Sequence, residues 1–437
     1  MGAVACHAPG VPSMPSWVAV GWWYHILRLA SPFIGAHVGD QPAARTPTAI
    51  DPELTLSLGG PIYQRAVLDR LAEPVEGVGK KRILLLVALT WLPLVALTGA
   101  AGTLLPGIEQ PLLRDVGISA RLLVALPLLV IAELPVGRWI RLVLREFRGS
   151  GILGPDAVPG FDAALARLRR GRDSGLAELL LLALSIGTPL AVYFTGGLAD
   201  RLGGGATTWF GAADGGISAA GKWFFFVAAP IFQFHLYRWL YRLVLWGVFL
   251  RRVSVLDLRL RPAHPDLAGG LGMLSTCQQS FAAVFLAIGT VLSGALGNQI
   301  LHAGAQVAQF NTVIGAYLVL TALIAFGPLL LFAKALVELK REGQLAYSGA
   351  ATRMLGQFEP AWTSTWSTPP SRPEQLDPSM VTDFAAIHAN ALRLRAIPID
   401  PRALVSFVLL VALPFLPLLL TEMSFKELLK HLAGVLM

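Results

Sequence analysis

Three basic side chains lie on one face of an apolar stretch and could bind an anion inside a membrane. The stretch 223–250 reads WFFFVAAPIFQFHLYRWLYRLVLWGVFL and contains His235, Arg238 and Arg242. At about 100° per residue, these three fall within roughly 60° of one another on a helix. A charge at mid-bilayer costs about 3 kcal/mol on insertion scales, so an arginine there indicates a functional site that faces protein or water. The guanidinium groups would attract an anion, and the imidazole would adjust that attraction with pH.

The same residues also fit a second interpretation. If the hydrocarbon core covers only about the first 20 residues of the stretch, the string Tyr237-Arg238-Trp239-Leu240-Tyr241-Arg242 becomes a belt of aromatic and snorkelling basic side chains at the membrane surface. The belt suits Arg242 best. It suits His235 least, because His235 lies about two helical turns deeper than Arg242. The sequence leaves both interpretations open.

Glu133 is another ionisable residue well inside an apolar run. It precedes Arg138 near the cytoplasmic end of its run, as Arg238 precedes Arg242 near the same end of another. If Arg138 and Arg242 mark one membrane surface, Glu133 and Arg238 lie within about 2 Å of each other in depth. We therefore predict an ion pair between the two helices, which either holds and gates the arginines or is purely architectural.

A further group of polar residues follows this stretch. Arg261, His264 and Asp266 could form a metal or phosphate site, but one histidine and one carboxylate fall short of the three protein ligands of a usual catalytic zinc. The favoured alternative is a capped turn in which Asp266 accepts backbone N–H groups. No motif implies a cofactor or a resident metal, because Walker, GxSxG, HExxH and dinucleotide-binding patterns are missing from the sequence.

The string Arg261-Pro262-Ala263-His264-Pro265-Asp266, followed by Gly269-Gly270-Leu271, resembles a signature, R-P-x-H-P-D-x-x-G-G-L, of uncharacterised bacterial polytopic inner-membrane proteins. The similarity runs from about Pro61 to the end. It includes a tail that resembles P-L-x-x-L-L-K, although Met423-Ser424 stands where proline and leucine are expected. The resemblance implies a bacterial membrane placement. It implies no activity and assigns no functional residue.

The composition is that of a membrane protein. Of 437 residues, 54% are hydrophobic and 14% are charged, which is too apolar for an ordinary soluble domain. The net charge of +8 is spread between apolar runs and does not form one patch, so nucleic acid is not an expected partner. Seven runs are long enough to span a bilayer: about 83–101, 120–140, 176–196, 223–245, 281–298, 312–333 and 403–421. We predict an all-α polytopic bundle of about seven transmembrane helices with amphipathic interfacial helices.

The positions of lysine and arginine predict the orientation. They concentrate in the segments 51–82, 141–174, 251–261 and 334–402, and they are sparse in 102–119, 198–222, 299–311 and 422–437. The positive-inside rule then places the N-terminus in the cytoplasm and the C-terminus outside. The predicted location is the bacterial inner (cytoplasmic) membrane, with multiple passes.

The chain divides into four parts on this basis. They are a loosely ordered leader (1–50), a transmembrane bundle of six spans (51–335), a cytoplasmic helical connection (336–402) and a seventh span with an outer amphipathic tail helix (403–437). The connection should continue the sixth span as a helix to about Leu355 and then form a helix from Asp377 to about Leu394. We expect the basic segment 153–172 to be an amphipathic helix lying on anionic lipid. The loop 197–221 should be a flexible coil that dips Trp209 into the membrane surface.

The fifth run carries a stripe of small residues at four-residue spacing. Gly289, Ser293 and Gly297 would let another helix approach closely. That helix could belong to this chain or to another subunit, and we expect a homo-oligomer. The stripe itself indicates packing and no chemistry.

The sequence therefore favours a channel or transporter for a small anion or anionic solute, lined by His235, Arg238, Arg242 and Glu133. One alternative is a membrane-embedded enzyme that acts on a lipid-linked or phosphorylated substrate at the cytoplasmic face. A further alternative is a non-catalytic subunit of a membrane complex. Enzymatic activity is the less favoured interpretation, because no long soluble segment is present to carry it.

Overall fold

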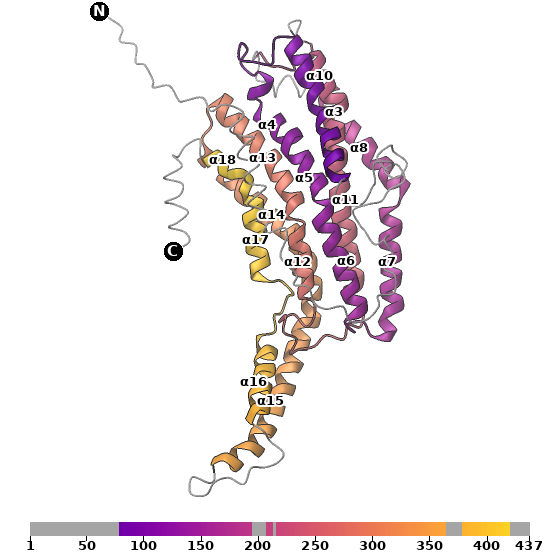
Figure 1. Cartoon of the computed structure of the whole chain (residues 1–437), viewed down its shortest axis with the longest axis vertical. Helices are drawn as coiled ribbons and strands as arrows, with labels where there is room; N and C mark the ends of the chain where they lie inside the picture. The colour runs from indigo at the N-terminus through magenta and orange to yellow at the C-terminus, as the bar shows by residue number, and fades with distance from the viewer. Residues whose placement is uncertain (1–77, 195–206, 213–215, 364–377, 420–437) are drawn as a thin grey trace, which may run out of the picture.

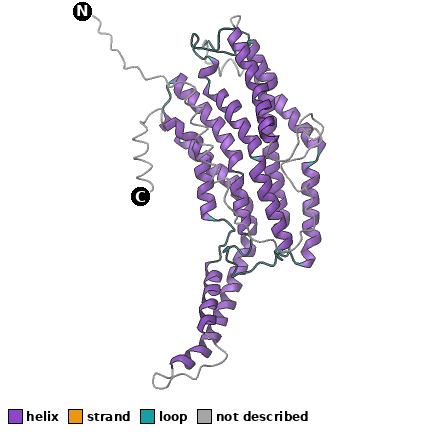
Figure 2. Cartoon of the chain, viewed as in Figure 1, coloured by secondary structure: helices purple, strands orange, loops and turns teal. Residues whose placement is uncertain are grey.

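The computed structural model describes residues 78–194, 207–212, 216–363 and 378–419. In these ranges the chain is helical, its helices are joined by loops, and no strand is formed (Figure 2). The predicted leader 1–50 and tail helix 424–437 lie outside the described residues.

The helices form an elongated bundle from which one pair projects (Figure 1). Its main helices are α3 (Val78–Ala100), α6 (Glu133–Gly149), α7 (Val158–Arg172), α8 (Gly175–Phe194), α11 (Ala229–Ser254), α12 (Gly272–Ser280), α13 (Ala282–Ala303), α14 (Asn311–Phe326), α15 (Ala333–Thr363), α16 (Pro378–Arg393) and α17 (Pro401–Ala412). Shorter elements extend them: α4 (Val116–Ser119), η3 (Ala120–Ala125) and α5 (Leu126–Ile131) lead into α6, and α10 (Ala219–Trp223) and η5 (Phe224–Ala228) lead into α11. Likewise, η7 (Gly327–Phe332) joins α14 to α15, and η8 (Leu413–Phe415) and α18 (Leu416–Leu419) continue α17.

Six of the described helices are long and apolar enough to cross a membrane. They are Lys80–Ala100, Val116–Gly149, Gly175–Val192, Gly272–Ala303, Val307–Glu359 and Pro401–Leu419. Large apolar side chains project from them into the surroundings, such as Leu84 at 71% and Leu176 at 70% exposure. Water would disfavour so many exposed leucines, whereas lipid tails accept them. The protein is therefore an all-helical, membrane-embedded bundle.

The predicted count of seven spans is not confirmed. The rod formed by α10, η5 and α11 is absent from those six, although it lies among them in the bundle (Figure 1). The physical reason is its composition, because two arginines, Gln233 and His235 lower the hydropathy of the run 223–245.

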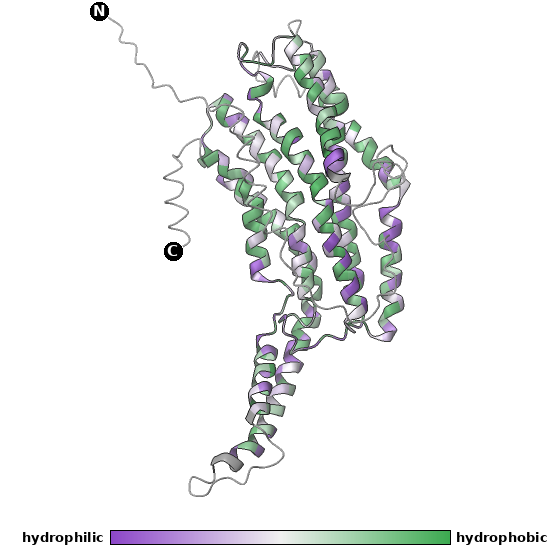
Figure 3. Ribbon diagram, in the orientation of Figure 1, coloured by the Kyte–Doolittle hydropathy of each residue, from purple (hydrophilic) through white to green (hydrophobic). Residues whose placement is uncertain are grey.

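One end of the bundle is more polar than the other. Helix α6 continues the second apolar run well beyond its predicted end at residue 140, and it buries Val136, Ile140 and Phe147 on one face. Figure 3 shows hydrophilic residues gathered on α6, α7 and the adjoining half of α11. Helix α3 begins partway along the bundle, near the junction of α5 and α6 (Figure 1).

The expectation that the segment 153–172 lies on lipid is wrong for its apolar face. The segment forms helix α7 as predicted, but Phe161, Leu165 and Leu168 are buried. Phe161 lies between Phe147 of α6 and Phe249 of α11, with ring centroids 5.7 and 5.8 Å away. An apolar helix face can be covered by protein as well as by lipid, and here neighbouring helices cover it.

The expectation that Trp209 dips into the membrane surface is also wrong. Trp209 is 1% exposed, and its indole Nε1 donates to Asp115 Oδ2 at 3.0 Å. Asp115 Oδ1 caps α4 by accepting from the Ile118 backbone N–H and also accepts from Asn298 Nδ2 of α13 at 2.8 Å. Hydrogen bonding decides this placement, because the indole N–H meets a buried carboxylate that needs donors.

The connection between the sixth and seventh predicted runs forms the two helices that were expected. Helix α15 continues the sixth run through η7, and α16 packs against it as an antiparallel hairpin that projects from the bundle (Figure 1). Tyr347 and Phe384 join the two helices with ring centroids 6.3 Å apart.

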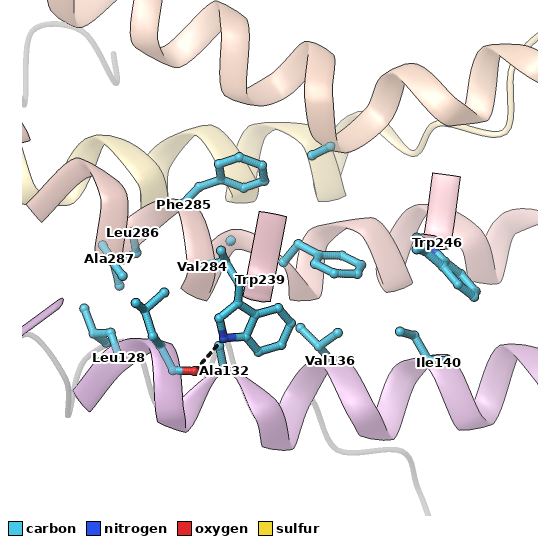
Figure 4. Packing of buried hydrophobic residues seen from close by; sticks show 14 of the residues in the cluster. Leu128, Ala132, Val136, Ile140, Trp239, Trp246, Val284, Phe285, Leu286 and Ala287 are labelled. Atoms are coloured by element: carbon cyan, nitrogen blue, oxygen red, sulfur yellow. Dashed lines mark hydrogen bonds between the residues drawn. The ribbon is translucent and has the colours of Figure 1, made fainter. Parts of the chain in front are cut away.

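Trp239 of α11 lies at the centre of the core (Figure 4). Its indole N–H donates to the Leu129 carbonyl at 2.7 Å, beside the break between α5 and α6. Pro135, which has no N–H to give to the carbonyl four residues earlier, accounts for that break. Trp239 therefore ties α11 to the irregular part of the second helix.

We expect Trp239→Phe to lower the stability of the protein by roughly 1–3 kcal/mol, because the buried Leu129 carbonyl loses its donor. The measurement is the melting temperature in detergent. Trp246→Phe is the matched control, since the buried Trp246 Nε1 has no hydrogen-bond partner among the described residues. The two variants should differ clearly, and equal losses would contradict the assigned role of the hydrogen bond.

Candidate functional site

Three arginines converge on the Glu133 carboxylate inside the bundle. Arg82 Nη1 donates to Glu133 Oε2 at 2.8 Å. Arg242 Nη1 lies 3.6 Å and Arg238 Nη1 lies 4.0 Å from Glu133 Oε1. The Glu133 side chain is 10% exposed, and those of the three arginines are between 4% and 7% exposed. This buried group of four is called the Glu133 cluster below.

The cluster joins three helices that are far apart in sequence. Arg82 lies in the first turns of α3, Glu133 opens α6, and Arg238 and Arg242 stand one turn apart on α11. Side chains four residues apart share one helix face, so both α11 arginines can reach the same carboxylate. The break at Ala132 lies just before Glu133, between α5 and α6. It therefore sets the direction in which the Glu133 side chain points.

The predicted ion pair between Glu133 and Arg238 is confirmed as a contact. Arg242, which suited the snorkelling belt best, is 3% exposed and points into the protein. Its guanidinium carbon lies 5.2 Å from the centroid of the Trp239 ring. The belt interpretation is therefore wrong for Arg238 and Arg242, because a carboxylate and an aromatic face inside the bundle satisfy them better than headgroups would.

His235 lies one turn from Arg238 and is only half-buried. Its Nδ1 lies 2.8 Å from the Ile231 carbonyl, to which it donates as the neutral Nδ1–H tautomer. This contact leaves Nε2 as the ring nitrogen that can meet a ligand or a proton. His235 is thus near the Glu133 cluster along α11 but is not one of its ion-paired members.

Sequence reasoning missed Arg82. Lys80, Lys81 and Arg82 together resemble the basic flank that precedes many membrane helices. Lys80 is exposed, whereas Arg82 is 5% exposed. The only sequence signal for the burial of Arg82 is its position at the very edge of the apolar run. That position does not tell which neighbouring helix the Arg82 side chain faces.

The Arg261–Asp266 segment is a capped turn. Asp266 Oδ1 accepts from the backbone N–H groups of Ala268 at 2.8 Å and Gly270 at 3.2 Å, and Oδ2 accepts from Gly272 at 2.8 Å. Gly269 and Gly270 have φ of 67° and 101°, which explains why glycine occupies both positions. The favoured interpretation of this motif is confirmed.

The turn also fixes its surroundings. His264 Nδ1 lies 2.7 Å from Asp266 Oδ1, and Arg395 Nη2 donates to the Asp266 carbonyl at 2.9 Å. Arg261 is exposed at the edge of the turn. Among the described residues, no three of His, Cys, Asp and Glu come together as metal ligands. The motif thus connects α11, α12 and the segment before α17.

The pKa of Asp266 lies below its ordinary value. Partial burial acts to raise it, but the backbone N–H groups of Ala268, Gly272 and Gly270 stabilise the charged form more strongly. The carboxylate therefore adds stability above its unfolded pKa of about 3.9. That contribution is lost as the pH falls through the lower native pKa.

The small-residue stripe on α13 is covered by the chain's own helices. Ser293 Oγ donates to the Pro414 carbonyl at 2.6 Å. A Cβ added at Gly289 would lie 3.1 Å from the Tyr317 hydroxyl, and one at Gly297 would lie 3.5 Å from Leu418. The close helix approach expected of the stripe is present, and α14, η8 and α18 provide it.

Comparison with models of protein families, with curated proteins and with solved structures finds no match. The resemblance to uncharacterised bacterial inner-membrane proteins therefore stays a prediction.

We expect Glu133→Gln to destabilise the protein by about 3–5 kcal/mol, because it leaves buried guanidinium groups without their shared carboxylate. Glu146→Gln removes an exposed carboxylate from the same helix and should change stability by less than about 0.5 kcal/mol. Thermal unfolding of both variants in one detergent compares them. A Glu133→Gln variant as stable as Glu146→Gln would show that the cluster contributes nothing to folding.

We expect Asp266→Ala to cost at least about 2 kcal/mol, since three backbone N–H groups lose their acceptor. Asp257→Ala, at an exposed position shortly before the turn, is the control. The advantage of the wild-type protein over Asp266→Ala should begin to shrink when melting temperatures are measured below about pH 4, and it should shrink further towards the lower native pKa. A constant difference between the two down to pH 3 would argue against the carboxylate.

Proposed function

We propose that this protein is an integral membrane channel or transporter for a small anion or anionic solute. The observation that carries the proposal is the burial of Arg238 and Arg242, at 6% and 3% exposure, within a membrane-embedded bundle. Charged groups among membrane helices are costly and are kept where they face a substrate or ion path. Guanidinium groups bind carboxylate, phosphate and similar anions with several directed donors.

In this proposal the Glu133 carboxylate holds the place of the transported anion. It already receives Arg82, Arg238 and Arg242. An entering anion would compete for the same donors and release Glu133, and its departure would restore the ion pairs. Glu133 therefore acts as a gate, because its carboxylate is an anion that binds the same arginines as the substrate. His235, one turn away with Nε2 available, adds a donor when it is protonated.

We further propose that the rod from Ala219 to Ser254 is a seventh span. Its elements contain 5, 5 and 26 residues, and at about 1.5 Å per residue they exceed the roughly 30 Å hydrocarbon core. The part around Arg251 then extends beyond the membrane, together with the last turns of α6, α7 and the hairpin. The basic residues on these elements support a cytoplasmic location for that end and for the N-terminus. The bacterial inner membrane is the proposed location.

No observation favours the two rival functions. An enzyme that uses Arg261, His264 and Asp266 would need an available carboxylate, but both Asp266 oxygens accept backbone N–H groups. A partner subunit would need an open packing surface, but the α13 stripe is covered from within the chain. Homo-oligomer formation stays a prediction.

The proposal is tested by anion flux into proteoliposomes, beginning with chloride. We expect Arg238→Gln to lower flux about tenfold or more, because a charge-assisted hydrogen bond contributes about 1.5–3 kcal/mol. The control is Arg138→Gln, which removes an exposed arginine from α6 and should leave flux unchanged. Each variant must first elute as a folded, monodisperse protein. Equal flux through the wild type and folded Arg238→Gln would reject the role of the cluster.

A further inference from the structure

Arg121 is a further arginine within a membrane-length helix, towards the opposite end of that helix from α6. It lies in η3, and its guanidinium carbon is 5.9 Å from the Phe224 ring centroid and 5.8 Å from that of Phe232. Two aromatic faces thus hold one cation between the second helix and the rod containing α11.

The Arg121 guanidinium retains unused hydrogen-bonding capacity. Its Nε is buried and has no hydrogen-bond partner among the described residues. The carboxylate nearest in sequence, Asp115, is engaged by Ile118, Asn298 and Trp209. Aromatic rings attract a cation but accept hydrogen bonds only weakly, so an acceptor brought by a ligand would be better.

The local backbone is irregular on both sides of Arg121. The segment Ala120–Ala125, which contains Arg121, is π-helical, and so is Phe224–Ala228, which contributes one of the two rings. Short π-helical segments are uncommon and occur frequently at functional sites. Here residues of two such segments, Arg121 and Phe224, come into contact at one half-buried cation.

The surface of α11 that meets Arg121 continues towards the Glu133 cluster. Phe232, His235 and Arg242 fall within about 80° of one another on the helix. The ten residue steps from Phe232 to Arg242 cover about 15 Å along the helix. Basic groups therefore occur in succession from Arg121, past His235, to Arg238 and Arg242.

We infer that Arg121, with Phe224 and Phe232, forms a second anion-binding site on the path that leads to the Glu133 cluster. This inference rests on the proposed function. The ligand is a small anion, which the guanidinium binds through its free N–H donors while the phenyl rings shield the pair from lipid. Two sites about 15 Å apart let an anion be exchanged between them, so that neither has to hold it tightly.

The test is chloride flux into proteoliposomes as a function of chloride concentration. We expect Arg121→Gln to raise the half-saturating concentration about tenfold or more, as the loss of a charged donor requires. Arg121→Lys keeps the charge but loses the planar donor array. Its half-saturating concentration should lie between those of the wild type and Arg121→Gln. Arg114→Gln removes an exposed arginine seven residues earlier and should behave as the wild type.

The outcomes separate this inference from the proposed function. Normal half-saturation in folded Arg121→Gln, together with lost flux in Arg238→Gln, would overturn the second site and leave the first. Absence of flux of chloride, nitrate and phosphate in the wild type would overturn both. If Arg121→Gln does not fold, Arg121→Lys decides, because an unchanged half-saturation would overturn the inference and a raised one would support it.

Discussion

The ion pairing of the Glu133 carboxylate with three arginines constrains the whole arrangement of the bundle. Each of these charges would lose several kcal/mol of hydration on burial, and only mutual contact offsets that loss. Arg82, Glu133, Arg238 and Arg242 come from three helices, so α3, α6 and α11 must all meet at one depth. Apolar packing alone would allow these helices to slide or rotate, whereas the cluster specifies a single register.

Two other polar networks join the helices, one on each side of the Glu133 cluster. Towards one end, Asp115 joins the start of α4 to Asn298 of α13 and to the buried indole of Trp209. Towards the other, the Asp266 turn joins the end of α11 to the start of α12 and to Arg395. In both networks a carboxylate accepts backbone or side-chain N–H groups that the ends of helices and loops leave over. These carboxylates hold the fold together. They differ in this from Glu133, whose side-chain partners among the described residues are guanidinium groups.

The distribution of charge supports transport more than catalysis. A catalytic site needs groups that are free to react, and the motif with the most reactive-looking composition has its carboxylate fully engaged. The arginines instead stand along α11 and the neighbouring helices, at several depths of a membrane-embedded bundle. A row of cations with one built-in carboxylate is suited to pass an anion by exchange of partners. The helices that carry these arginines also contain the irregular backbone segments, namely η3, η5 and the break between α5 and α6.

The sequence by itself determined that the protein is helical and membrane-embedded, because lipid demands long apolar runs with internally bonded backbones. It also predicted the two helices α15 and α16, the Asp266 turn and the contact between Glu133 and Arg238, since each depends on local spacing or on depth along a helix. Only the tertiary structure decided that Arg82 joins the cluster, that Trp209 is buried and that α7 packs on protein. Helical periodicity tells which face of a helix a residue occupies, but the neighbour of that face is chosen by contacts between distant segments.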